Sequence, residues 1–159
     1  RDVAGRVRLP ILRKDFIKTK EQVLESREAG ADAILLISSM LSINTIRELY
    51  AYSTILGMDT VIEVHNEEEM EAISGLNPVI IGINNRDISK HETDNGDVSR
   101  TEILAPLIPD DCLLISESSI TSPGDVRRAM DAGADAVLVG TALMKAPDIR
   151  AKLKELMIP

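Results

Sequence analysis

The chain has 159 residues, of which 44% are hydrophobic and 28% are charged, a composition typical of a folded globular protein. Its net charge of -8 and its aromatic content of 2% argue against a nucleic-acid-binding surface, which requires basic side chains and aromatic platforms. The single cysteine excludes an intrachain disulfide and fits a reducing compartment, so we expect a cytoplasmic protein. No apolar run reaches the roughly 18 residues of a membrane span, so we expect no membrane partner.

Apolar runs alternate with helix-forming stretches along the whole chain. After a basic start at residues 1–8, expected to be the tail of a helix, strands are predicted at 9–16, 31–37, 60–65, 79–87, 112–116 and 134–139. Helices are predicted at 19–29, 44–56, 67–74, 98–107, 123–133 and 147–157, with a polar loop at 89–97. A strand that recurs about every 25 residues, with a helix after it, predicts βαβ units and a parallel sheet in one domain over residues 1–159.

Boundary residues support these elements. Asn66 is a good N-cap, Pro123 suits a first helical turn, and Gly30 and Gly133 are expected helix stops. The pattern fits either an open doubly wound sheet or part of a barrel. An open sheet usually carries a glycine-rich first turn, and the chain has no GxGxxG or Walker pattern. Six βα units also do not complete an eight-stranded barrel.

Polar side chains follow the carboxyl ends of the predicted strands, where α/β enzymes place their sites. Taken singly, each is more often structural than catalytic. In a barrel they meet at one rim, where a lysine and two carboxylates form a general acid–base set. Because residues two apart share a strand face, we expect Asn84 and Arg86 to point together and Asn85 to point away. For the same reason, we expect Lys14 and Glu63 to enter one cavity. The full set is Lys14, Glu63, Asn84 with Arg86, Glu117 with Ser118, and Gly140 with Thr141.

Small residues and hydroxyls follow the last two predicted strands, at Ser118, Ser119, Gly140 and Thr141. Backbone N–H groups beside helix starts bind anions, and barrels commonly hold phosphate after their seventh and eighth strands. The alternative is ordinary turn chemistry. The sequence therefore predicts a phosphate site at these residues.

Three apparent metal signals are incomplete. The run His65-Asn66-Glu67 matches the HxE of zinc deaminases, but their paired cysteines are missing. Neither His65 nor His91 has partners at metal-ligand spacing. The run at 94–97 lacks the remaining ligands of a calcium loop and is predicted to be a turn. We therefore expect no metal and no cofactor.

Five short runs resemble the indole-3-glycerol-phosphate synthase family in their order and spacing. They are Pro10-Ile11-Leu12-Arg13-Lys14-Asp15-Phe16, Ile62-Glu63-Val64-His65, Ile81-Gly82-Ile83-Asn84-Asn85-Arg86-Asp87, Ile115-Ser116-Glu117-Ser118 and Val139-Gly140. The LRKDF and GINNRD runs are specific to that family. The resemblance covers essentially the whole chain and implies an α/β fold of the (β/α)8 TIM-barrel family, with strands three to eight present. It also implies closure of the indole pyrrole ring of 1-(2-carboxyphenylamino)-1-deoxyribulose 5-phosphate, with loss of carbon dioxide and water, in tryptophan biosynthesis.

The same resemblance implies roles for the strand-end residues. Lys14 would act as a cationic acid on the ketone and the anthranilate carboxylate. Glu63 would take or relay a proton during rearomatisation and dehydration. Asn84 and Glu117 would orient the substrate and settle charge around its amine. The implied substrate-binding residues are Arg86 and Ser118, and the implied phosphate cradle is Ser118, Ser119, Gly140 and Thr141.

The chain departs from the family at two places. Ser119 stands where the family has a glycine, and we expect its Cβ to weaken phosphate binding. The family's first two strands, with a second catalytic lysine and a glutamate, are absent from this sequence. We therefore expect the isolated chain to have very low activity and to self-associate or pair with the missing units. The alternatives are a non-catalytic unit that depends on assembly, or another phosphate-binding barrel enzyme.

Overall fold

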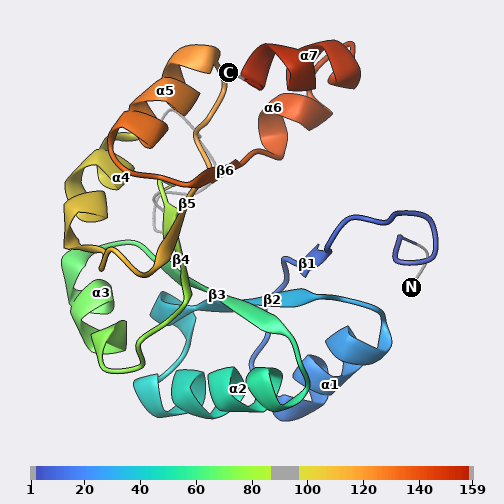
Figure 1. Ribbon diagram of the computed structural model, residues 1–159, viewed down its shortest axis with the longest axis vertical. Coiled ribbons are helices and arrows are strands. Elements are labelled where there is room, and N and C mark those ends of the chain that lie inside the picture. The colour runs from blue at the N-terminus through green and yellow to red at the C-terminus, as the bar shows by residue number, and fades with distance from the viewer. Residues whose placement is uncertain (1–2, 87–96, 158–159) are drawn as a thin grey trace.

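The computed structural model describes residues 3–86 and 97–157, and its six strands form one curled parallel sheet in the order β1-β2-β3-β4-β5-β6 (Figure 1). Every neighbouring pair is parallel, as the alternating pattern predicted. This is the arrangement of six consecutive βα units of a (β/α)8 barrel. The strands are β1 (Leu12–Arg13), β2 (Ala33–Ile37), β3 (Asp59–Val64), β4 (Ile80–Asn84), β5 (Leu113–Glu117) and β6 (Ala136–Leu138).

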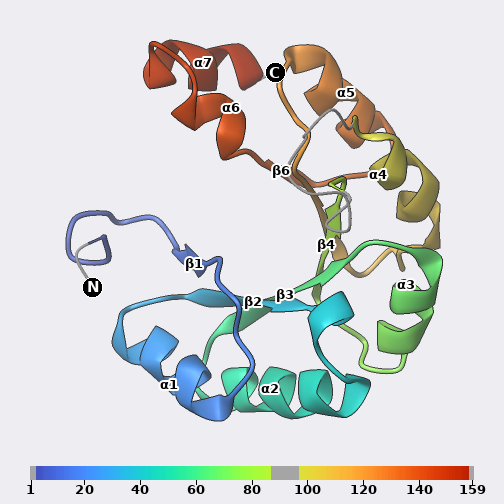
Figure 2. The ribbon, with the colours of Figure 1, turned by 180° about the vertical axis from the view of Figure 1, so that it is seen from behind.

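The helices lie on the outer, convex face of the sheet, and the view from behind shows the same arc open between β1 and β6 (Figure 2). None of the described helices is long and apolar enough to cross a membrane. The helices are α1 (Lys20–Glu28), α2 (Ile43–Ile55), α3 (Glu67–Ser74), α4 (Ser99–Leu104), α5 (Pro123–Asp131), α6 (Thr141–Met144) and α7 (Ile149–Leu156), with short 3-10 turns η1 (Ser38–Met40) and η2 (Ala105–Leu107).

Local capping explains where several helices begin. Asn66 accepts a hydrogen bond from the main-chain N of Glu69 and starts α3 where the sequence predicted. Thr19 and Ser122 each form a reciprocal capping box with the third helical residue, at the starts of α1 and α5. At the other ends, Gly30 and Gly133 adopt φ of 89° and 110°, values that side chains disfavour, so both predicted stops are confirmed.

Two apolar layers follow from the period-two alternation of the strands. Side chains facing the helices, such as Ile34, Ile62 and Ile81, form the larger buried cluster. Those on the concave face form a smaller cluster around Leu35 and Val61. On β3, β4 and β5 the next inward residues are Glu63, Asn84 and Glu117, so this part of the concave face changes from aliphatic to polar at its rim.

The predicted strand at 9–16 is the main correction to the expected elements. Only Leu12 and Arg13 join the ladder, while Leu9 and Phe16 are 76% and 60% exposed. Pro10 has no N–H to donate, and β1 has a ladder partner on one side only among the described residues. β6 is likewise shorter than predicted, and residues 3–6 form a turn rather than the tail of a helix. Asp87, His91 and the predicted loop as far as residue 96 lie outside the described residues.

Candidate active site

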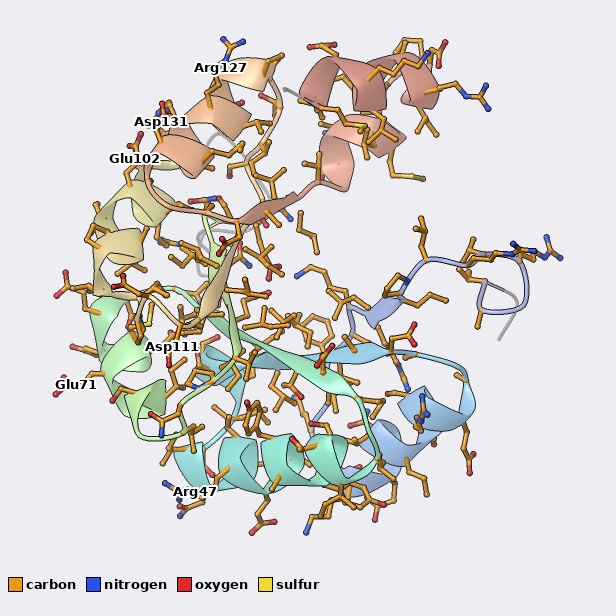
Figure 3. The ribbon with its side chains drawn as sticks, in the orientation of Figure 1. Arg47, Glu71, Glu102, Asp111, Arg127 and Asp131 are labelled. Atoms are coloured by element: carbon orange, nitrogen blue, oxygen red, sulfur yellow. The ribbon has the colours of Figure 1, made fainter. Side chains whose placement is uncertain are left out.

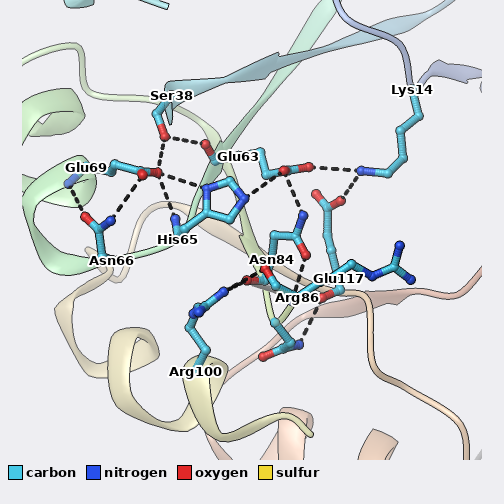
Figure 4. Close-up of polar contacts among 11 residues, drawn as sticks. Lys14, Ser38, Glu63, His65, Asn66, Glu69, Asn84, Arg86, Arg100 and Glu117 are labelled. Carbon is cyan, nitrogen blue, oxygen red and sulfur yellow. Dashed lines mark hydrogen bonds and ion pairs between the residues drawn. The ribbon is translucent and has the colours of Figure 1, made fainter. Parts of the chain in front are cut away.

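Lys14 sits between two buried carboxylates at the rim of the concave face. Its Nζ donates to Glu117 Oε2 at 2.6 Å and to Glu63 Oε2 at 3.0 Å (Figure 4). The side chain of Glu63 is 2% exposed and that of Glu117 is 0% exposed, whereas the lysine side chain is 40% exposed. The sequence prediction that Lys14 and Glu63 enter one cavity is confirmed by this contact. The arrangement presents one solvent-accessible cation backed by two carboxylates.

Strand register places these three groups together. Val61 lies on the concave face, so Glu63, two residues on in β3, faces the same way. Leu12 also packs on that face, and Lys14 follows it by two residues. Glu117 ends β5, two residues after the inward-facing Ile115. The alternation that builds the aliphatic layer therefore also aims the charged groups.

The three groups set each other's proton affinities. Burial raises the pKa of Glu63, but the contact with His65, the hydrogen bond from Asn84 and the charge of Lys14 outweigh it and lower that pKa to about 2. Burial lowers the pKa of Lys14, and the two carboxylates outweigh it, so the net shift is upward. Lys14 and Glu63 are therefore an ammonium and a carboxylate at neutral pH.

Glu117 differs from Glu63 in the direction of its shift. Burial raises the pKa of Glu117, and the nearby Glu63 adds to the effect, against the opposing charge of Lys14. Its Oε1 accepts no hydrogen bond from the described part of the chain. Two neighbouring carboxyls with oppositely shifted pKa values commonly divide acid and base roles, and Glu117 is the one that takes up a proton first as pH falls.

The end of β4 is braced from both faces. Asn84 donates to Glu63 Oε1 at 2.9 Å, on the concave side. Asn85 points away, as predicted, and donates to Ser116 Oγ and the main-chain O of Glu117 at 3.0 Å each. Arg100 of α4 donates to the main-chain O atoms of Asn84 and Arg86 at 2.8 Å. The sequence did not predict this role of Arg100, because the neighbouring residues in the chain carry no signal that its side chain contacts the end of β4.

A separate cavity of about 200 Å³ lies where β5 and β6 end. Arg86 reaches this region, with its Nη2 3.5 Å from Thr141 Oγ1. Lys14 also lines the cavity, so the lysine of the acid–base cluster and the predicted phosphate residues border one space. The remaining lining residues include Ser118, Ser119, Gly140 and Thr141, all four of the predicted phosphate set.

The backbone at the β5 end is unusual for its residue types. Ser118 and Ser119 adopt φ of 66° and 58°, in the left-handed region that favours glycine. The positive φ of Ser119 is one physical reason for the glycine that the resembled family has at this position. Gly140 differs, with φ of -114° and open space where a Cβ would be. Backbone conformation therefore explains a glycine at position 119 and not at position 140.

A polar network behind Glu63 was also missed from the sequence. His65 Nε2 lies 3.2 Å from Glu63 Oε1, and its Nδ1 lies 3.1 Å from Glu69 Oε2 in α3. A larger cavity of about 720 Å³ lies on the far side of His65, next to α3 and α4, and its lining includes none of Lys14, Glu63 and Glu117. We place the candidate site at the carboxylate cluster, because there a half-exposed lysine contacts two buried carboxylates at the rim where the predicted residues meet. The described residues contain no cluster of three or more metal-ligating side chains.

Comparison with known proteins decides the family. The model of the indole-3-glycerol phosphate synthase family matches residues 1–156. The chain belongs to the indole-3-glycerol phosphate synthase family. The indole-3-glycerol phosphate synthase of Thermococcus kodakarensis is 47% identical over 157 residues, which cover 99% of this chain and 68% of that protein. That of Pyrococcus furiosus is 49% identical over 147 residues, covering 92% and 64% respectively.

Coverage of these synthases is partial. A third relative, the indole-3-glycerol phosphate synthase of Dehalococcoides mccartyi, is 49% identical over 94% of this chain and 57% of its own length. The chain thus spans 57–68% of the length of these synthases. Among solved structures, 3-hexulose-6-phosphate synthase from Salmonella typhimurium matches 92% of the chain with a TM-score of 0.79 and 14% sequence identity. That likeness concerns the fold alone.

Membership of the synthase family narrows the alternatives left open by the sequence. The matched relatives are synthases rather than other phosphate-binding barrel enzymes, as the LRKDF and GINNRD runs indicated. The described rim gathers Lys14, Glu63, Asn84 and Glu117 into one bonded cluster. It places Arg86 and Ser118 in the adjoining cavity. The functional roles of these residues remain predictions.

Proposed function

We propose that this chain carries the ring-closing site of an indole-3-glycerol-phosphate synthase, a carbon–carbon lyase of tryptophan biosynthesis. The substrate is 1-(2-carboxyphenylamino)-1-deoxyribulose 5-phosphate, and the products are indole-3-glycerol phosphate, carbon dioxide and water. The observation that carries the proposal is the Lys14 ammonium held by Glu63 and Glu117 at the barrel rim. Family membership supports the proposed reaction, and the contacts within the site support the proposed roles.

Lys14 is the acid for ring closure. The aromatic carbon that bears the carboxylate attacks the ketone carbon, and the ketone oxygen gains negative charge that a nearby cation stabilises. Lys14 has a raised pKa and a side chain 40% exposed, so it is charged and within reach of a bound molecule. Its proton passes to the ketone oxygen, which becomes a hydroxyl group. Loss of carbon dioxide then returns the electron pair of the broken bond to the aromatic ring.

Glu63 is the base for dehydration. Glu63 takes the proton that the ring carbon next to nitrogen loses, and relay of a proton to the leaving hydroxyl group releases it as water, so the step is balanced. While Lys14 is protonated, its charge helps to hold the pKa of Glu63 at about 2. Once Lys14 has given up its proton, that contribution disappears and Glu63 becomes a stronger base. Glu63 therefore becomes an effective base only after Lys14 has acted as the acid.

Glu117 and Asn84 complete the cluster. Glu117 accepts a hydrogen bond from Lys14 Nζ at 2.6 Å. Its pKa is raised, so it can take up a proton released near the lysine during the reaction. Asn84 fixes Glu63 Oε1 by its amide. These contacts support roles in orienting the substrate and in balancing charge around its amine.

The phosphate of the substrate is assigned to the cavity at the ends of β5 and β6. That cavity is lined by Arg86 and by residues 118–121 and 138–142, and main-chain N–H groups at such strand ends can serve as donors for an anion. Lys14 lines the same cavity, so a short sugar chain can place its phosphate there and its ketone at the ammonium.

A product assay tests the proposal. The chain is assayed for indole-glycerol-phosphate formation alone and after addition, covalently or as a peptide, of the two βα units that the family resemblance places before β1. In the assembled protein, Lys14→Met is expected to lower kcat by at least about a hundredfold, the scale of a lost general acid. Lys20→Met, which removes a surface cation paired with Glu48, is the matched control and should leave the rate unchanged. Equal rates for the two variants would overturn the assignment.

A further inference from the structure

The carboxylate of Glu69 is fixed at the start of α3 by donors from three directions. Its Oε2 accepts from the main-chain N of His65 at 2.9 Å and from the ring Nδ1 at 3.1 Å, and it lies 2.5 Å from Ser38 Oγ (Figure 4). Its Oε1 accepts from Asn66 Nδ2 at 3.1 Å. The side chain is 17% exposed. Glu69 therefore holds the imidazole of His65 in one orientation.

The two ring nitrogens of His65 both face carboxylate oxygens. Nδ1 carries a hydrogen, because its partner Glu69 offers only acceptors. Nε2 lies 3.2 Å from Glu63 Oε1, in a contact whose ring N–H is not aligned as in a regular hydrogen bond. A bare lone pair at Nε2 would repel that oxygen, whereas a second proton makes the contact attractive. The side chain of His65 is only 10% exposed, so little water screens this contact.

We propose that His65 is a positioning residue: a doubly protonated imidazole clamped between Glu63 and Glu69 that keeps Glu63 ionised and aimed at the lysine. Its meaning for catalysis rests on the proposed function, whereas its charge state does not. Glu63 then faces three groups that hold it: the charged ring of His65, and the hydrogen-bond donors Asn84 and Lys14. When Lys14 gives its proton to the substrate, His65 and Asn84 still hold the carboxylate in place.

The charges around His65 favour this state. Burial lowers the pKa of His65, but hydrogen bonds and charges from Glu63 and Glu69 outweigh it and raise that pKa. Lys14, just after β1, is a cation on the far side of Glu63. The cavity on its other side is lined by three acidic groups and one basic group, Glu67, Glu68, Asp97 and Arg100.

Histidine NMR tests the charge state without any activity. The chain has two histidines, so a His91→Gln variant leaves the signals of His65 alone. We expect both ring nitrogens to show protonated ¹⁵N shifts at pH 7. Conversion to a neutral ring should come at a higher pH than for an ordinary histidine, because two carboxylates face the ring. A singly protonated ring at pH 7 would overturn the proposal, whether or not the protein is a synthase.

Two variants assign the cause. Glu69→Gln removes one of the two facing charges and should lower the titration midpoint of His65. Glu71→Gln is the matched control, because Glu71 lies on the same helix and points away from the sheet (Figure 3). An equal effect of both variants would contradict the clamp. If Glu69→Gln does not fold, the wild-type ring shifts still decide the matter.

A kinetic arm tests the positioning role in the assembled protein. His65→Gln should lower kcat about tenfold with little change in KM, and should move the acidic limb of the kcat–pH profile upward. The shift is upward because loss of the imidazolium raises the pKa of Glu63. Unchanged kcat and an unchanged acidic limb would show that His65 is only structural. Absence of turnover in the wild type would instead count against the proposed function and leave the NMR result standing.

Discussion

Gly82 leaves the space that the carboxyl group of Glu117 occupies. A Cβ built at Gly82 would overlap Glu117 Oε1 and would come within 3.1 Å of both the carboxyl carbon of Glu117 and Val61 Cγ1. Gly82 lies in β4 on the concave face, between the inward positions of Ile80 and Asn84. The glycine therefore allows a fully buried glutamate to fold back over the neighbouring strand and meet Lys14.

Gly82→Ala is expected to displace Glu117 and break its 2.6 Å contact with Lys14. Misplacement of a catalytic group by about 1 Å can cost about a hundredfold in rate, and we expect a loss of that size. Overpacking should also lower the free energy of unfolding by about 1–3 kcal/mol. Gly75→Ala is the control, since Gly75 has a negative φ and no heavy atom near its Cβ position. A Gly82→Ala protein with normal kcat and stability would show that the site tolerates the methyl group.

The depressed pKa of Glu63 predicts a pH dependence of stability. The pKa falls from 4.5 to about 2 on folding, so the carboxylate stabilises the fold above pH 4.5 and loses that contribution as pH falls toward 2. The contribution at neutral pH is about 3 kcal/mol. Urea unfolding from pH 7 to pH 3 should show a steeper loss of stability for the wild type than for Glu63→Gln. Parallel curves would mean that Glu63 is not held ionised.

Ser119→Gly tests the strained turn after β5. Replacing a side chain at φ of 58° by hydrogen should raise the free energy of unfolding by about 1 kcal/mol. It should also tighten inorganic phosphate binding in calorimetry, if the Cβ obstructs the cavity. Asn77→Gly is the control: Asn77 has φ of 47°, lies before β4 outside the cavity, and should gain stability without a change in phosphate affinity. Unchanged affinity for Ser119→Gly would remove the obstruction as an explanation.

The sequence predicted the features that depend on neighbours in the chain. Asn66 begins α3 and Gly30 follows α1 because caps and stops act over a few residues. Period two also predicted that Lys14 and Glu63 meet. It could not predict the clamp on His65, because Glu69 reaches the imidazole only after α3 turns back over the end of β3.

The space that Gly82 leaves for Glu117 could not be predicted from the sequence either. Gly82 matters through a side chain on another strand, and no local pattern marks it. The lengths of β1 and β6 were overestimated for a related reason. Their residues have suitable composition, but a ladder needs a partner strand, and the described residues supply one on a single side. Long-range geometry, rather than propensity, determined each of these features.

The two ends of the sheet lead to the last prediction. β1 and β6 each pair on one side only within the described residues, which leaves main-chain N–H and C=O groups without a ladder partner along both edges. Apolar side chains lie beside these edges, including Leu9 at 76% exposed and Met144 at 77% exposed. Parallel sheets are normally covered on both faces, yet Leu12 and Ile115 on the concave face are only half-buried.

We therefore expect the isolated 159-residue chain to self-associate as concentration rises, as measured by light scattering after size exclusion. Adding the two βα units that precede β1 in the family resemblance should give a monomer, because they satisfy both edges at once. Ala136→Lys, a charge on the exposed edge of β6, should weaken association, whereas Ala51→Lys on the exposed face of α2 should not. If the chain stays monomeric at high concentration, or if both lysine variants act alike, association does not run through the sheet edges.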